Sequence, residues 1–68
     1  MRAMLRGTVS EFDGARGLGT VTGEDGSDWT FHVIEIADGT RSIDVGQDVV
    51  FQPLPKFGRR QAGRLYKL

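Results

Sequence analysis

The chain has no cysteine and no long apolar run. Without cysteine it can form no disulfide, no zinc ribbon or knuckle and no thiolate nucleophile. A membrane-spanning helix needs about 18 or more apolar residues in a row, and the opening residues 1–6 lack the apolar centre of a signal peptide. We therefore expect a cytoplasmic domain with no membrane partner, whose stability rests on its own hydrophobic core.

A net charge is also absent, because nine Lys and Arg residues balance nine Asp and Glu residues and the pI is about 6.5. General polyanion binders usually carry a clear basic excess. The charges are unevenly distributed, however. Between Glu24 and Asp48, Arg41 is the only Lys or Arg, whereas no acidic residue follows Asp48. The basic residues of this last stretch are Lys56, Arg59, Arg60, Arg64 and Lys67. We expect a basic C-terminal end.

Clustered catalytic residues are absent as well. His32 is the only histidine, and three serines are scattered over different predicted strands and loops. These serines are Ser10, Ser27 and Ser42. No triad is supported by this arrangement, and no second His or Cys is present for a transition-metal site. The acidic residues 24–28 lack the spacing of a calcium loop. We expect no enzymatic activity, no cofactor and no metal.

Short runs of β-branched and aromatic residues, separated by turns, are what the sequence does contain. The pairs Asp13-Gly14 and Asp25-Gly26 give tight-turn signals. The predicted strands are residues 5–12, 17–22, 29–34, 49–51 and about 61–67. Residues 35–46 form a longer connection with a helical turn, and residues 54–60 form a basic loop. Pro53 is expected to end the fourth strand or to push it to an edge.

Five short strands without sustained helical periodicity predict an all-β fold, a closed or nearly closed small barrel. An SH3-like barrel is the structural alternative at this point. The 68 residues support a single domain over residues 1–68, with one small core and modest stability. Trp29 and Phe31 share one parity of their strand, so we assign both to the core. Thr30 and His32 then point outward.

Several short motifs follow one another along the chain. Residues 7–13 read Gly-Thr-Val-Ser-Glu-Phe-Asp, residues 16–21 Arg-Gly-Leu-Gly-Thr-Val, residues 29–33 Trp-Thr-Phe-His-Val, residues 46–51 Gly-Gln-Asp-Val-Val-Phe and residues 61–62 Gln-Ala. In order and spacing, the chain from about Arg6 to Leu65 resembles the bacterial cold-shock domain family. The family's motifs are Gly-x-Val-Lys-Trp-Phe-Asn, Lys-Gly-Phe-Gly-Phe-Ile, Val-Phe-Val-His-Phe, Gly-Gln-x-Val-x-Phe and Gln-Ala. The resemblance implies a five-stranded antiparallel OB-fold barrel that binds single-stranded RNA or DNA.

The aromatic positions of this family hold other residues here. The family's tryptophan is replaced by Glu11, and its phenylalanines are replaced at five positions. These are Leu18, Thr20, Thr30, Val33 and Thr40. Each stacked base contributes about 1–3 kcal/mol. Losing most of the platform therefore predicts binding that is weaker by several orders of magnitude and largely electrostatic.

The resemblance implies a nucleic-acid-binding face with an adjacent basic loop. The candidate residues are Phe12, Arg16, Leu18, Thr20, Thr30, His32, Lys56, Phe57, Arg59 and Arg60. His32 occupies the family's base-stacking histidine position, and Arg16 that of a phosphate-contacting basic residue. Phe12 either offers a ring face or packs in the core. The alternative function is that of a repurposed barrel that binds a protein partner through its polar face. A contiguous aromatic surface would favour the first function, whereas a smooth polar β-face with an unrelated apolar patch would favour the second.

Overall fold

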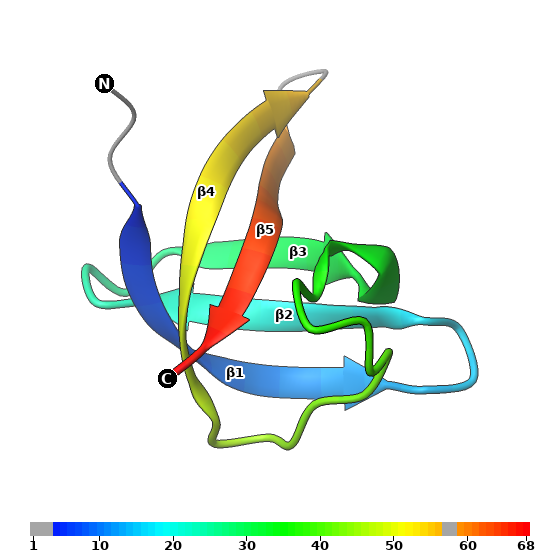
Figure 1. Ribbon diagram of the computed structural model, residues 1–68. Helices are drawn as coiled ribbons and strands as arrows, with labels where there is room; N and C mark the ends of the chain where they lie inside the picture. The colour runs from blue at the N-terminus through cyan, green and yellow to red at the C-terminus, as the bar shows by residue number, and fades with distance from the viewer. Residues whose placement is uncertain (1–3, 57–58) are drawn as a thin grey trace.

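The computed structural model describes residues 4–56 and 59–68, which form a closed five-stranded barrel (Figure 1). The strands are β1 (Leu5–Asp13), β2 (Leu18–Gly23), β3 (Asp28–His32), β4 (Asp48–Lys56) and β5 (Arg59–Lys67), with a short 3-10 helix η1 (Val33–Glu35) after β3. Their order around the barrel is β1-β2-β3-β5-β4. The predicted all-β barrel of five strands is confirmed. In the described part of the chain, no helix is long and apolar enough to cross a membrane.

Strand pairing is antiparallel except where the barrel closes. Figure 1 shows the β4–β5 hairpin crossing the sheet of β1, β2 and β3. β3 meets β5 in a parallel sense through the pair Thr30 and Gln61, and an isolated parallel bridge joins Ile36 to Leu65. β3 and β5 thus share fewer paired residues than the other neighbouring strands do. β1 and β2 therefore present their outer face together with β3, as one sheet.

The core is built from apolar side chains that alternate along the strands. Its buried members are Val9, Val21, Phe31, Ile36, Ile43, Val49, Phe51, Ala62 and Leu65. In β2 the inward positions Gly19, Val21 and Gly23 alternate with the half-buried Leu18, Thr20 and Thr22. Successive side chains of a strand point to opposite faces, so burying one set presents the other set to solvent.

A β-bulge in β1 decides which face Glu11 and Phe12 occupy. The pairing with β2 shifts between Val9 and Glu11, so that Val9 lies opposite Val21 and Glu11 opposite Thr20. Because side chains alternate with a period of two, an unbulged strand would place Glu11 on the inner face with Val9. The extra residue reverses the alternation: Glu11 is exposed and Phe12 is half-buried against the core.

Most predicted strand boundaries differ from the observed ones by one or two residues, and the ends of the third and fourth strands have a clear structural cause. The third strand ends at His32 instead of residue 34, because the chain turns through η1, where the Ile36 amide donates to the Val33 carbonyl oxygen at 3.1 Å. This turn brings Ile36 into the core and leaves Ile34 exposed. The fourth strand does not end near Pro53 but continues to Lys56. The predicted loop at residues 54–60 is correspondingly shorter, since β5 already begins at Arg59.

The continuation through Pro53 has a physical reason. β1 pairs with β4 only from Asp48 to Phe51, whereas β5 pairs with β4 as far as Lys56. Beyond Phe51, β4 is therefore an edge on its β1 side. A proline has no amide hydrogen, and at an edge this absence breaks no ladder hydrogen bond.

Trp29 is only half-buried, although we assigned it to the core with Phe31. Its ring centroid lies 5.5 Å from that of Phe51 in a tilted arrangement, and its indole N–H donates to Ser27 Oγ at 2.9 Å. Phe31 is fully buried as expected. A tryptophan at the margin of a core satisfies its polar N–H while its ring packs on apolar neighbours.

Candidate nucleic-acid interface

The predicted β-face positions lie side by side on β1, β2 and β3. Glu11 is directly opposite Thr20, and Thr20 is directly opposite Thr30. Two pairs further along, on the same face, Leu18 is opposite His32. Cross-strand neighbours of this kind have Cβ atoms about 4.5–5.5 Å apart. The sheet thus brings together side chains from three strands on one outward face.

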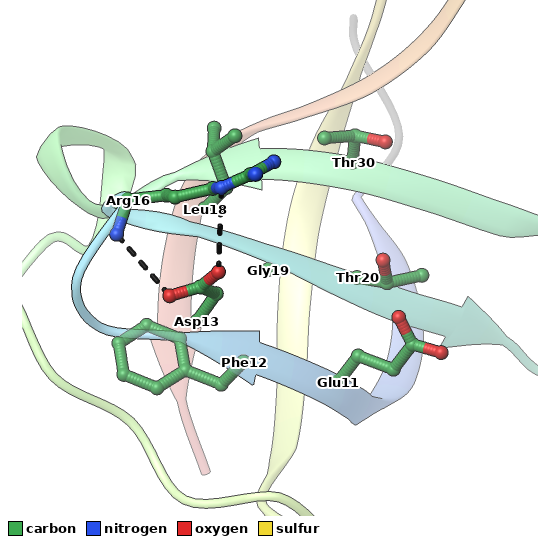
Figure 2. Close-up of a pocket in the computed structure, with 8 residues that line it drawn as sticks. All are labelled: Glu11, Phe12, Asp13, Arg16, Leu18, Gly19, Thr20 and Thr30. Carbon is green, nitrogen blue, oxygen red and sulfur yellow. Dashed lines mark hydrogen bonds and ion pairs between the residues drawn. The ribbon is translucent and has the colours of Figure 1, made fainter.

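This face contains a shallow, open concavity of about 300 Å³ (Figure 2). Its lining residues are Glu11, Phe12, Asp13, Arg16, Leu18, Gly19, Thr20 and Thr30. The volume is at the lower end of the range for small-ligand sites. Figure 2 shows Arg16 and Leu18 at one end of the concavity, and Glu11, Thr20 and Thr30 toward the other end. A flexible chain lying across the sheet could contact both ends.

The turn between β1 and β2 holds Arg16 at one end of the concavity. Asp13 Oδ1 accepts hydrogen bonds from the amides of Ala15 and Arg16, at 3.1 and 3.2 Å. The Gly17 amide donates to the Asp13 carbonyl oxygen at 2.9 Å, and Gly17 has a φ of 69°. Arg16 Nε lies 3.7 Å from Asp13 Oδ2, and both side chains are largely exposed. Exposed ion pairs contribute roughly 0–1 kcal/mol, so this pair leaves Arg16 available to a phosphate.

Phe12 both packs and lines the site. Its ring is stacked on Phe31, with centroids 6.5 Å apart and planes 10° apart. The ring also borders the concavity. The two readings of Phe12 left open by the sequence are therefore compatible, since a half-buried ring offers part of its surface to each side.

His32 is exposed but lies outside this concavity. It borders a second hollow of about 300 Å³ beyond β3, together with Ile34, Leu54 and Gln61. Thr30 lines both hollows. His32 therefore extends the face toward β5 and does not line the concavity that Arg16 borders.

The candidates around the β4–β5 hairpin are only partly described. Phe57 lies outside the described residues, as do the side chains of Lys56 and Arg59, so their contacts with nucleic acid stay a prediction. Arg60 is exposed, and its guanidinium carbon lies 6.0 Å from the centroid of the Trp29 ring. This is at the limit of a cation–π contact.

Two acidic residues of the concavity, Glu11 and Asp13, were not among the predicted site residues. Glu11 was identifiable as the occupant of the family's tryptophan position, and Asp13 as the start of the turn.

In residues 4–56 and 59–68, no three His, Asp or Glu side chains gather closely enough to hold a metal ion.

The closed barrel of five strands and its open face of three strands define a small nucleic-acid-binding β-barrel of the OB type. Residues 5–68 match the family model described as the 'Cold-shock' DNA-binding domain, and the chain belongs to this family. Cold shock protein 2 and cold shock protein 1 of Lactiplantibacillus plantarum are each 43% identical to it over 49 residues, which is 71% of this chain and 74% of either relative.

A solved structure also shares the fold. The structure described as drosophila Unr CSD456 superposes with a TM-score of 0.83 at 28% sequence identity. The alignment covers 98% of this chain but 27% of that chain, so the present domain spans about a quarter of its length. The resemblance read from the sequence is confirmed, and this chain is a cold-shock domain, a nucleic-acid-binding module.

Proposed function

We propose that this domain binds single-stranded RNA or DNA weakly, mainly by electrostatic attraction, without catalysis and in the cytoplasm. The observation that carries the proposal is the β1–β3 face, which lies on a barrel with the family's fold and whose central residues are not aromatic. Arg16 would contact a phosphate at one end, and the bases would lie over the apolar parts of Leu18, Thr20 and Thr30. His32 and the border of Phe12 offer the remaining ring surface.

The proposed weakness follows from the small ring area. Stacking contributes about 1–3 kcal/mol per base in domains with an aromatic platform. Here Phe12 gives one side of its ring to Phe31, and Glu11 adds a charge that repels phosphate. A Kd well above those of platform-bearing domains is the expected consequence.

Fluorescence anisotropy with labelled oligo-dT and oligo-U tests this function. Arg16→Gln should weaken binding, because a phosphate contact is lost. Arg6→Gln is the matched control, since Arg6 is also an exposed arginine near an aspartate, 3.9 Å from Asp48, and does not line the concavity. Equal effects of the two variants, or tight binding to a duplex, would argue against the proposed face.

A protein partner is the second candidate. Exposed apolar side chains occur at Ile34 on η1, at Val45 in the loop before β4, and at Tyr66 on β5. Such residues occur on many monomeric surfaces. This candidate gains support only if the titration above shows no binding to any single strand.

A further inference from the structure

We infer that Glu11 turns the concavity into a reader of base edges that prefers guanine. This inference rests on the proposed single-strand binding. Glu11 places a carboxylate where the family has a stacking tryptophan, and the inference concerns what this carboxylate binds.

The position of Glu11 is set by the fold. The β-bulge turns its side chain outward, directly across from Thr20, whose other neighbour is Thr30. Ser10 Oγ donates to the Thr20 carbonyl oxygen at 3.3 Å and links the two strands beside Glu11. Figure 2 shows the carboxylate of Glu11 and the hydroxyl of Thr20 at the end of the concavity remote from Arg16. A carboxylate and a hydroxyl thus lie side by side at this end of the concavity, while the charged Arg16 and Asp13 lie at the other.

The two acids of the concavity differ in their partners. Asp13 accepts backbone hydrogen bonds and lies beside Arg16. Glu11, by contrast, makes no ion pair and no side-chain hydrogen bond with any residue in the described part of the chain. Its acceptor sites therefore face the space that a ligand would occupy. No internal contact has to be broken before a ligand binds there.

The chemistry of a carboxylate selects the part of a nucleotide that fits. An ionised carboxylate only accepts hydrogen bonds, and its charge repels phosphate. The Glu11 end of the concavity therefore suits a neutral group that donates. Bases of single strands are splayed out and present their Watson–Crick edges. In a DNA strand, a base edge and not the backbone is the group that this end can bind.

Guanine is the base whose edge matches. Its N1–H and 2-amino group are adjacent donors, so a carboxylate can accept from both in a fork. Thymine and uracil have a single N3–H between two carbonyl oxygens, and those oxygens would face the carboxylate. Adenine and cytosine pair one amino group with a ring nitrogen that accepts. Next to Glu11, the hydroxyl of Thr20 can donate to guanine O6.

The test is a set of labelled heptamers titrated by fluorescence anisotropy at low salt. One heptamer is all thymine, and the others carry a central guanine, adenine or hypoxanthine. A single guanine prevents self-association of guanine-rich strands. We expect the guanine heptamer to bind on the order of tenfold more tightly than the all-thymine one. Hypoxanthine keeps N1–H and O6 but lacks the 2-amino group, and should lose most of this preference.

Variants assign the preference to the carboxylate. In Glu11→Gln the guanine preference should fall to about twofold or less, because an amide offers one acceptor and one donor in place of two acceptors. Affinity for the all-thymine heptamer should rise as the repelling charge is removed. Glu24→Gln makes the same chemical change at an exposed carboxylate in the β2–β3 turn, outside the concavity. It should keep the preference.

The outcomes separate this inference from the proposed function. Binding of all heptamers with equal affinity, or a guanine preference that survives Glu11→Gln, would overturn the inference and leave single-strand binding in place. If no heptamer binds to the native domain even at low salt, both fail together. A guanine preference lost in Glu11→Gln and kept in Glu24→Gln supports the inference.

Discussion

At the scale of single residues, Gly19 shows how closely the site and the core are joined. Gly19 lies on the floor of the concavity, and the ring of Phe31 packs directly against it from inside. A Cβ at this position would also meet the Glu11 carbonyl oxygen at 2.9 Å. The absence of a side chain therefore allows the core aromatic to approach the sheet beneath the binding face.

Gly19→Ala should consequently destabilise the domain by about 1–3 kcal/mol, the usual cost of overpacking. The added methyl group must displace either the buried ring or the backbone of β1. Urea denaturation followed by tryptophan fluorescence measures the change. Gly14→Ala is the control, since its Cβ would meet only the Phe12 ring, at 3.4 Å. Equal stability of the two variants would show that Phe31 adjusts without cost.

Trp29 gives a second prediction at this scale. Trp29→Ala removes a half-buried ring that packs on Phe51 and the hydrogen bond to Ser27. We expect a loss of about 3 kcal/mol, the lower end of the range for aromatic truncation, measured by thermal melting. Trp29→Phe should retain most of the packing. Unchanged melting of Trp29→Ala combined with lost oligonucleotide binding would instead make Trp29 a binding residue.

At the scale of elements, the β1–β3 face combines the family's barrel with other residues at the family's aromatic positions. Restoring rings with Glu11→Trp, Leu18→Phe, Thr20→Phe and Thr30→Phe should strengthen single-strand binding by orders of magnitude, because each ring adds about 1–3 kcal/mol of stacking. The four positions are exposed or half-buried, so the fold should tolerate the changes.

Titration with oligo-dT, accompanied by gel filtration, checks the restored face, since added surface rings can promote self-association. A folded monomer that binds no better than the native domain would place the binding surface elsewhere. The restored protein should also have no preference for guanine, because Glu11 is gone.

The loop between η1 and β4 is attached to β5 by a small polar cluster. Asp38 Oδ1 accepts from the amide and the hydroxyl of Thr40, at 3.0 and 2.8 Å. Lys67 Nζ lies 3.2 Å from Asp38 Oδ2 and donates to Thr40 Oγ1 at 3.0 Å. The hydrogen bonds from Thr40, and then the contact with Lys67, lower the pKa of Asp38 below its ordinary value of 3.8.

This lowered pKa predicts a pH dependence. A carboxylate whose pKa is lower in the folded state stabilises the fold at pH values above its ordinary pKa. This contribution is lost as the pH falls through the lowered pKa of the folded state. The melting temperature of Asp38→Asn should therefore lie below that of the native domain at neutral pH. The gap should begin to narrow at about pH 3.8 and should disappear only below the lowered pKa of the folded state. Asp44→Asn, in the same loop, is the control. A gap independent of pH would mean that Asp38 acts only through its shape.

At the scale of the whole molecule, balanced charge and an uneven distribution have opposite effects on binding. The zero net charge gives no general attraction to a polyanion. The charge of Lys67, one of the basic residues of the C-terminal part, is partly offset by Asp38, which lies beside it. The proposed function therefore assigns binding to a few local cations, such as Arg16.

The affinity for a single strand should accordingly fall as salt rises. If about three phosphates are contacted, the logarithm of the binding constant falls with the logarithm of salt at a slope near −2, or about a hundredfold over a tenfold rise in salt. Titrations of oligo-dT at several salt concentrations give this slope. Tight binding that is insensitive to salt would show that stacking dominates after all.

The sequence by itself determined the class of fold, the family and the burial of Phe31. Alternating apolar residues and Asp-Gly turns predict a small β-barrel, and the glycine-framed motifs identify the family in an order that survives the loss of the aromatic residues. Phe31 is assigned to the core by parity alone, because a strand has a fixed period of two.

Only the tertiary structure decided where Glu11 lies, how far β4 extends and how deeply Trp29 is buried. The β-bulge that turns Glu11 outward depends on the register between β1 and β2, which no local pattern of Ser10 and its neighbours specifies. Pro53 is tolerated because β1 has already left β4 at that point. Each of these features depends on which strand lies beside which, and a pairing between distant segments is a property of the folded chain.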